Sequence, residues 1–201
     1  MRLRPSRFLS VITTTFVGLV MAATAMAAPA RAQTHEPILF VHGFDIFDLE
    51  NGTFNCTVDG NWIWNDMINN FRGTWPDVEV RTMTYNSCDS SATTAAKVAQ
   101  EVDALLDKTG AAKVDIVTHS LGSISTRYYL KNFPGALNKV DHWVSLGGPN
   151  HGSNDVLVNF CADVLLITSC REVSPYLISP FMVRLNTLMG DESPGPVHYG
   201  T

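Results

Sequence analysis

The sequence predicts an α/β fold in which helices cover both faces of a mostly parallel sheet. Short apolar runs that end in turn residues are typical of strands buried on both faces. They alternate along the chain with segments whose apolar residues recur at helical spacing. Because parallel neighbours are joined by right-handed crossovers, this alternation favours a parallel sheet. Reactive groups in such sheets gather at the carboxyl ends of the strands.

The elements follow one another in a regular order. Continuous or alternating apolar runs predict strands over residues 37–41, 78–85, 114–118 and 140–146. Helical spacing between them predicts helices over residues 62–71, 91–110 and 120–132. Ser91 can cap the second helix, and Gly110 ends it. Residues 150–196 predict a helical insert, after which Val197 begins another strand.

The first residues predict a secretory signal peptide. Three arginines precede an apolar run over residues 8–28, and the small residues Ala30 and Ala32 fit a cleavage site. An uncleaved anchor helix is the alternative, but small residues interrupt the run and no basic stop follows it. We therefore expect a leader at residues 1–32, one α/β domain at 33–201, and a secreted, extracellular mature protein.

The charge of the mature chain excludes one class of partner. Removing the leader takes four arginines with it, which leaves ten basic against 19 acidic side chains and a net charge of −9. Such a surface repels the phosphate backbone, so nucleic acid is not an expected partner. Past the leader there is no apolar run long enough to cross a bilayer. We expect a monomer that does not span the membrane.

The four cysteines predict two disulfide bridges, because thiols pair in exported proteins. Sequence allows three connectivities. We favour Cys56–Cys88 and Cys161–Cys170, since both members of each pair lie in predicted loops or inserts. Their spacing is unlike that of zinc ligands, and we expect no metal.

Residues 118–122, Thr-His-Ser-Leu-Gly, lie between an apolar strand and a helical segment. This is the setting of a nucleophile elbow, in which the serine is held at a strained positive φ and small residues flank it two positions away. Gly122 meets that requirement, whereas Thr118 stands where glycine is usual. The pattern predicts Ser120 as a nucleophile; the alternative is that Ser120 merely caps the helix.

A second motif lies upstream, where the strand at residues 37–41 ends in His42-Gly43-Phe44. With residues 127–131 and 146–152, the two motifs resemble the class 2 lipases of bacteria over most of the mature chain. The resemblance implies a compact α/β-hydrolase that acts on acylglycerols or other carboxylic esters without a metal or organic cofactor.

The resemblance also implies roles for single residues. The backbone N–H groups of Phe44 and Leu121 would form the oxyanion hole, and Phe44 would help line an acyl pocket. Gly43, His119 and Gly122 would support the elbow and its facing loop, and His42 would tie down its own loop.

The family order of the catalytic triad is Ser, then Asp, then His, and this order places the acid and the base beyond Thr201. Asp191 and Glu192 precede the last predicted strand and His198 lies within it. We therefore expect a fragment of a longer lipase. His151 is the least implausible substitute base, since a base must reach the Ser120 hydroxyl.

Two functions remain open at this point. One is a secreted serine ester hydrolase that forms an acyl-enzyme, with acyltransferase, phospholipase and cutinase as variants. The other is a non-catalytic remnant that at most binds acyl chains. The sequence does not separate a lipase from an esterase.

Overall fold

The computed structural model describes residues 35–45, 47–48, 53–174, 179–188 and 195–201. The predicted leader lies outside these residues. Within the part that is described, no helix combines the length and the apolar character that crossing a membrane requires.

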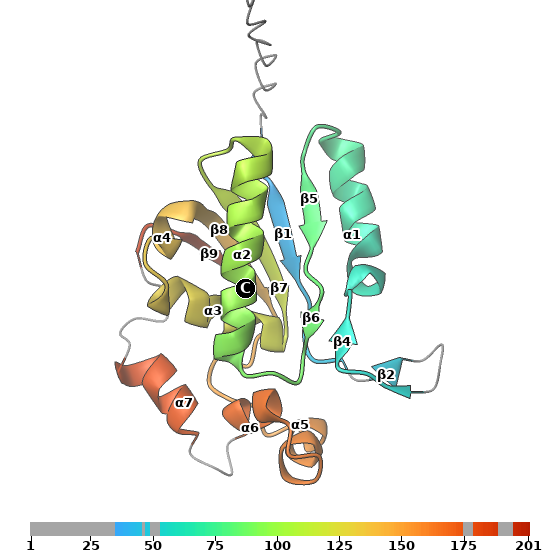
Figure 1. Cartoon of the computed structure of the whole chain (residues 1–201), viewed down its shortest axis with the longest axis vertical. Coiled ribbons are helices and arrows are strands. Elements are labelled where there is room, and N and C mark those ends of the chain that lie inside the picture. The colour runs from blue at the N-terminus through green and yellow to red at the C-terminus, as the bar shows by residue number, and fades with distance from the viewer. Residues whose placement is uncertain (1–34, 46, 49–52, 175–178, 189–194) are drawn as a thin grey trace, which may run out of the picture.

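The centre of the fold is a five-stranded parallel sheet with the order β5-β1-β7-β8-β9 (Figure 1). Its strands are β1 (Ile38–Val41), β5 (Val80–Thr82), β7 (Val114–His119), β8 (Val140–Leu146) and β9 (His198–Gly200). The predicted α/β class and its parallel sheet are confirmed. The middle position belongs to β7, and the strand expected after Val197 is the edge strand β9.

Helices cover both faces of this sheet. The bounds are α1 (Asn61–Thr74), α2 (Ser91–Thr109), α3 (Leu121–Asn132) and the short α4 (Ala136–Lys139). Alternate residues of β1 point to opposite faces, as the period of a strand requires. Phe40 packs with Trp64 and Ile68 of α1, whereas Leu39 lies in the core that α2, α3 and α4 share.

One predicted strand is wrong in its extent. Residues 78–85 are not a single strand: β5 ends at Thr82, and β6 (Tyr85–Asn86) leaves the main sheet to pair with β4 (Thr57–Val58). Beyond this point the Tyr85 hydroxyl donates a hydrogen bond to the carbonyl of His42, which ties the segment to the loop after β1. The short hairpin β2 (Phe47–Asp48) and β3 (Thr53–Phe54) was not predicted either.

The predicted cap of α2 is also displaced by one residue. Ser90, not Ser91, is the N-cap, and its Oγ accepts a hydrogen bond from the Thr93 N–H at 3.1 Å. The Ser91 N–H instead donates to the Glu172 carboxylate at 2.8 Å. Either serine suits a cap by its chemistry, and a contact distant in sequence selects between them.

The helical insert forms a separate layer at the carboxyl ends of the strands (Figure 1). It contains α5 (Val156–Asp163), α6 (Thr168–Val173), α7 (Pro180–Val183) and the π-helical turn η1 (Arg184–Leu188). Both predicted disulfides are confirmed. Cys161–Cys170 joins α5 to α6, and Cys56–Cys88 joins the loops before β4 and after β6.

Candidate active site

Ser120 lies at the carboxyl end of the central strand, between β7 and α3. Its backbone has φ 51° and ψ −126°, and among the described residues only Leu166 is another non-glycine with positive φ. Such a conformation is strained and persists only where the surrounding structure imposes it. The Ser120 side chain makes no capping hydrogen bond to α3. The hydroxyl is therefore not used to begin the helix.

Two glycines allow the elbow to pack directly against the loop that follows β1. A methyl group at Gly122 would lie 2.3 Å from the carbonyl oxygen of His42 and 2.8 Å from that of Val41. A methyl group at Gly43 would lie 2.6 Å from Cβ of Ser120. Both distances are below any normal contact. The structure thus brings together the two motifs that the sequence places far apart.

Thr118 is accommodated where glycine is usual because its buried hydroxyl has hydrogen-bond partners on every side. The Trp143 indole donates to Thr118 Oγ1 at 3.0 Å, and Thr118 Oγ1 donates to the carbonyl of Val144 at 3.1 Å. Ser123 Oγ lies 2.8 Å from the same oxygen. Thr118 and Ser123 are completely buried. This network joins β7, β8 and α3 beneath Ser120.

Replacing Thr118 by valine tests this network, because valine keeps the shape and removes the oxygen. We expect the free energy of unfolding to fall by about 1–3 kcal/mol, since the Trp143 N–H is left buried without a partner. Urea unfolding followed by fluorescence measures the loss. Thr118→Ser, which retains the hydroxyl, is the matched control. A valine variant as stable as the parent chain contradicts the role assigned to this oxygen.

The loop that faces Ser120 is held by contacts the sequence did not reveal. The His42 ring is buried, stacks on Tyr85 with ring centroids 4.2 Å apart, and its Nδ1 lies 2.7 Å from the carbonyl of Gly43. Burial raises the pKa of the Tyr85 hydroxyl, which therefore remains a donor to the His42 carbonyl. Tyr85 can be identified as a support of this loop only from the folded structure, because the residues around it in the sequence form no known motif.

His119 lies within the elbow as predicted. Burial lowers the pKa of its imidazole, so the ring is neutral at neutral pH. Its Nδ1 is buried with no hydrogen-bond partner among the described residues, and the ring meets Trp64 edge-on. Nothing in this arrangement gives His119 an acid that would orient it as a base.

The other histidines lie at two ends of the sheet. His142 and His198 are paired across β8 and β9, four residues before β8 ends at Leu146, so they lie about 13 Å from the edge that holds Ser120. His35 precedes β1 at that same far edge. His151 is exposed in the loop after β8, at the carboxyl edge. Among the described residues no hydrogen bond joins a histidine to the Ser120 hydroxyl.

Apolar side chains surround the elbow on the side of the insert. Leu121 and Ile124 of α3 pack with Val173, Met182 and Leu185, and Phe44 and Phe181 contact this cluster from its rim. Phe44 also packs against the Cys161–Cys170 bridge. An apolar group bound against this cluster would therefore meet hydrocarbon side chains.

Comparisons with known proteins agree with this geometry. A triacylglycerol lipase of Burkholderia plantarii is 29% identical over 175 residues, which are 86% of this chain and 45% of the lipase. The mature lipase BlEst2 of Bacillus licheniformis superposes with a TM-score of 0.60 at 21% identity, covering 87% of this chain and 66% of that one. A metagenomic carboxyl esterase gives 0.54 at 18% identity, with 88% and 52% covered.

The chain thus spans about half the length of the curated lipase that it matches. The palmitoyl protein thioesterase family matches residues 37–182, a stretch that includes both the His42-Gly43 loop and the elbow. On the strength of that match the chain belongs to the palmitoyl protein thioesterase family, and with it to the lipases and esterases of the α/β-hydrolase superfamily.

Proposed function

We propose that this chain carries the nucleophile half of a secreted carboxylic-ester hydrolase, in which Ser120 attacks the acyl carbon and forms an acyl-enzyme. The observation that carries the proposal is the strained φ of Ser120 at the end of the central strand, packed against Gly43. The fold maintains this strain without using the hydroxyl as a cap. Strain of this kind is typical of a reacting group.

The same local structure would stabilise the transition state. When Ser120 Oγ adds to the carbonyl, negative charge develops on the carbonyl oxygen. The backbone N–H of Leu121 is the first of α3, so the positive end of a 12-residue helix dipole lies at the elbow. The Phe44 N–H follows the glycine that touches Ser120. We assign the oxyanion hole to these two groups.

A base must accept the Ser120 proton for the attack to be fast. A neutral histidine does this in related hydrolases, and an acid holds it in place. Among the described residues, no hydrogen bond joins a histidine to the Ser120 hydroxyl. Because the chain spans 45% of the length of the Burkholderia lipase, we propose that the base comes from a part of the family fold that this match does not cover, with His151 as the residue to test first if the chain alone proves active.

The substrate is best described as an ester with an apolar acyl group. The cluster beside the elbow, built on Leu121 and rimmed by Phe44, suits a hydrocarbon chain. The family name points to thioesters and the Burkholderia relative to oxygen esters, and a serine acyl-enzyme can arise from either. We favour oxygen esters, because the lipase match extends over 86% of this chain. Two disulfides and the predicted leader support export.

The test compares this chain with a version extended to the full length of its family. Both are assayed with a p-nitrophenyl acyl ester and with an acyl thioester of the same chain length. We expect the 201-residue chain to stay near the buffer rate and the extended protein to turn over the oxygen ester faster. An extended, folded protein that hydrolyses neither substrate contradicts the proposed function. Robust turnover by the 201-residue chain would contradict the absence of a base.

A further inference from the structure

The segment that leaves the main sheet at β6 reaches back to the loop after β1. Tyr85 lies in β6 and Ser87 follows it, and both side chains are buried. Each hydroxyl forms hydrogen bonds with backbone groups of that loop, Tyr85 at residues 42 and 43 and Ser87 at Asp45. Phe44, whose N–H we assign to the oxyanion hole, lies between these two points of attachment.

The peptide unit that carries the Phe44 N–H is fixed through its carbonyl. That carbonyl belongs to Gly43, and its oxygen lies 2.7 Å from His42 Nδ1 and 3.3 Å from the Tyr85 hydroxyl. In a planar trans peptide the N–H and the C=O point in opposite directions, so holding the oxygen sets the direction of the N–H. Among the described residues, the Phe44 N–H donates no hydrogen bond, which leaves it available to a substrate oxygen.

The next peptide unit, between Phe44 and Asp45, is held by Ser87. The Asp45 N–H donates to Ser87 Oγ over 3.3 Å, and the Ser87 hydroxyl donates to the Asp45 carbonyl at 2.7 Å. One side chain thus binds both the donor and the acceptor of a single residue. Because the backbone has only two soft dihedrals per residue, holding the peptide units on both sides of Phe44 holds Phe44 itself.

Ser87 is itself fixed by three contacts. Its N–H donates to the Cys56 carbonyl at 2.7 Å, and its neighbour Cys88 forms the disulfide with Cys56. Its carbonyl accepts a hydrogen bond at 2.7 Å from the buried Ser169 hydroxyl of α6. A supporting group positions a reactive site only when its own conformation is fixed, and Ser87 meets that requirement.

We propose that Ser87 is a positioning residue of the oxyanion hole, which holds the Phe44 N–H in place through the backbone of Asp45. This inference rests on the proposed function, since an oxyanion hole matters only if an ester is attacked at Ser120. Such N–H groups stabilise the transition state because they are oriented before the reaction begins. The charge on the substrate oxygen develops only during the attack, so Ser87 should act on the chemical step and not on binding.

Ser87→Ala in the extended protein tests this role. We expect kcat for a p-nitrophenyl ester to fall by about tenfold, which is less than the loss of about 10²–10³-fold that follows removal of a whole donor, because the Phe44 N–H is displaced and not deleted. KM should change by less than about twofold. An alkylboronic acid forms a tetrahedral adduct with a serine hydroxyl, and its affinity should fall in parallel with kcat/KM.

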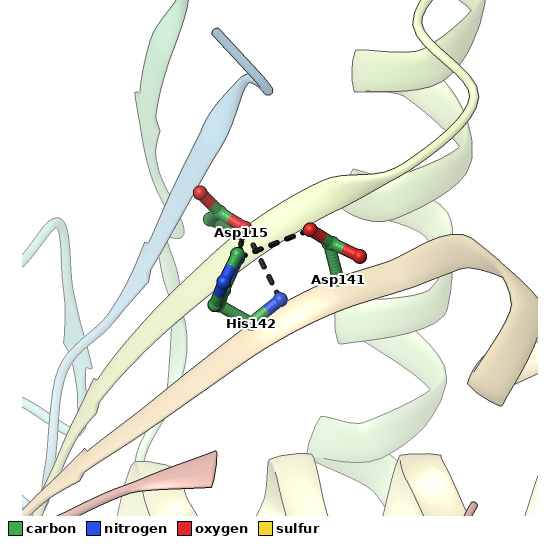
Figure 2. Close-up of side chains that lie close together, drawn as sticks. All are labelled: Asp115, Asp141 and His142. Atoms are coloured by element: carbon green, nitrogen blue, oxygen red, sulfur yellow. Dashed lines mark hydrogen bonds and ion pairs between the residues drawn. The ribbon is translucent and has the colours of Figure 1, made fainter. Parts of the chain in front are cut away.

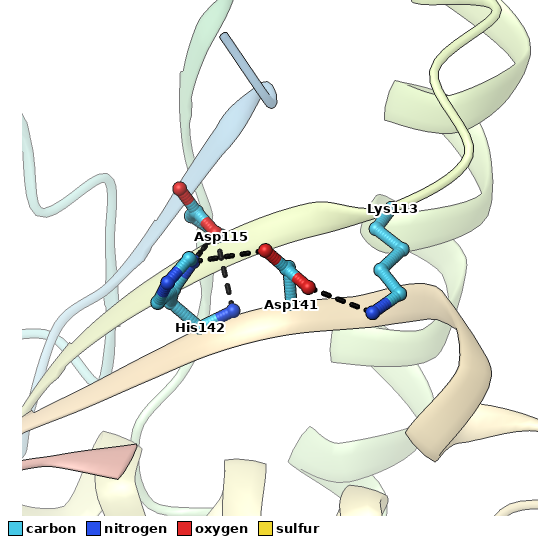
Figure 3. Close-up of polar contacts among 4 residues, drawn as sticks. All are labelled: Lys113, Asp115, Asp141 and His142. Carbon is cyan, nitrogen blue, oxygen red and sulfur yellow. Dashed lines mark hydrogen bonds and ion pairs between the residues drawn. The ribbon is translucent and has the colours of Figure 1, made fainter. Parts of the chain in front are cut away.

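Two control variants separate positioning from a general loss of stability. Ser90→Ala removes the N-cap of α2 and should lower stability without lowering kcat. Asp141→Asn weakens the ion pairs at the amino edge of the sheet, where the Asp141 carboxylate lies 3.2 Å from His142 Nδ1, beside Asp115 (Figure 2). The other oxygen of Asp141 lies 2.7 Å from Lys113 Nζ (Figure 3). Asp141→Asn should also keep the parent kcat.

A second measurement uses the 201-residue chain and does not require hydrolysis. Hydrogen exchange of the Asp45 amide, followed by NMR, should be at least about fivefold faster in Ser87→Ala, because its acceptor is removed. In Ser90→Ala the same amide should exchange at the parent rate. Circular dichroism confirms that each variant is folded. Should Ser87→Ala not fold, Ser169→Ala, which releases the Ser87 carbonyl, takes its place and should give a smaller loss of kcat.

The outcomes distinguish this role from the proposed function. If the extended parent hydrolyses no ester, the proposed function fails and the role of Ser87 in catalysis fails with it. If the parent is active while Ser87→Ala keeps its kcat and its affinity for the boronic acid, the function stands and the role of Ser87 is overturned. An equal loss of kcat in Ser90→Ala, or an unchanged exchange rate at Asp45, overturns it as well.

Discussion

Replacing Ser120 by alanine is expected to lower ester hydrolysis by about 10⁴-fold or more in the extended protein, because no nucleophile remains and only water attack at the oxyanion hole persists. The substitution removes one oxygen that makes no capping bond, so the fold should be unaffected. Initial rates with a p-nitrophenyl ester measure the loss, and mass spectrometry of the acylated peptide locates the acyl group on Ser120 in the parent protein.

Ser125→Ala is the matched control for this experiment. Ser125 is a buried serine on the same helix, and its hydroxyl makes only a long contact of 3.5 Å with the carbonyl of Leu121. It should retain the parent rate. If Ser120→Ala and Ser125→Ala hydrolyse the ester equally well, Ser120 is not the nucleophile.

The fold was largely predictable because its strands are buried on both faces. Runs such as Ile38–Val41 must be continuously apolar when helices lie above and below them, and this signal is local in sequence. What the sequence does not contain is the point at which a strand leaves the sheet. The chain leaves the sheet after Thr82, and Tyr85 then bonds to the loop after β1, more than 40 residues earlier, a contact that the local sequence does not show.

The residues of the candidate site fall into the same two groups: some could be predicted from the local sequence, and others depend on contacts between residues far apart in the sequence. Ser120 and Gly122 belong to one short motif whose spacing follows from the packing of a strand against a helix. Thr118 looked like a defect in that motif. Its hydroxyl in fact accepts a hydrogen bond from Trp143 of the neighbouring strand. This partner lies 25 residues away, and no sequence motif predicts it. The local geometry of the elbow could therefore be predicted from the sequence, whereas the contacts that support it can be identified only in the folded structure.

The residues that distinguish an active hydrolase from an inactive relative are separated by still longer distances in the sequence. Ser120 and its facing loop meet although Gly43 and Ser120 are 77 positions apart in the sequence. A histidine base must come to the same edge from another strand, and its acid from yet another. Three of the six described histidines, His35, His142 and His198, lie at the opposite edge of the sheet, which position in the sequence alone does not show for His142.

Adding a single methyl group at Gly122 is expected to have the largest effect on stability. In Gly122→Ala the new carbon would lie 2.3 and 2.8 Å from two backbone carbonyl oxygens of the loop after β1. Backbone atoms cannot swing aside as a side chain does, so the elbow and the loop must separate. We expect unfolding to become easier by about 3 kcal/mol, at the upper end of the cost of overpacking.

The separation should also disable the oxyanion hole, because its two proposed N–H groups lie on opposite sides of this contact. Gly73→Ala is the matched control: it lies in α1 with no atom within 4 Å of the added carbon. Alanine there should be neutral or stabilise the helix by up to about 1 kcal/mol. Urea unfolding of both variants, with ester hydrolysis in the extended protein, measures the contrast. Should Gly122→Ala prove as stable as Gly73→Ala, the elbow does not pack against His42 as described, and the assignment of Phe44 to the oxyanion hole fails with it.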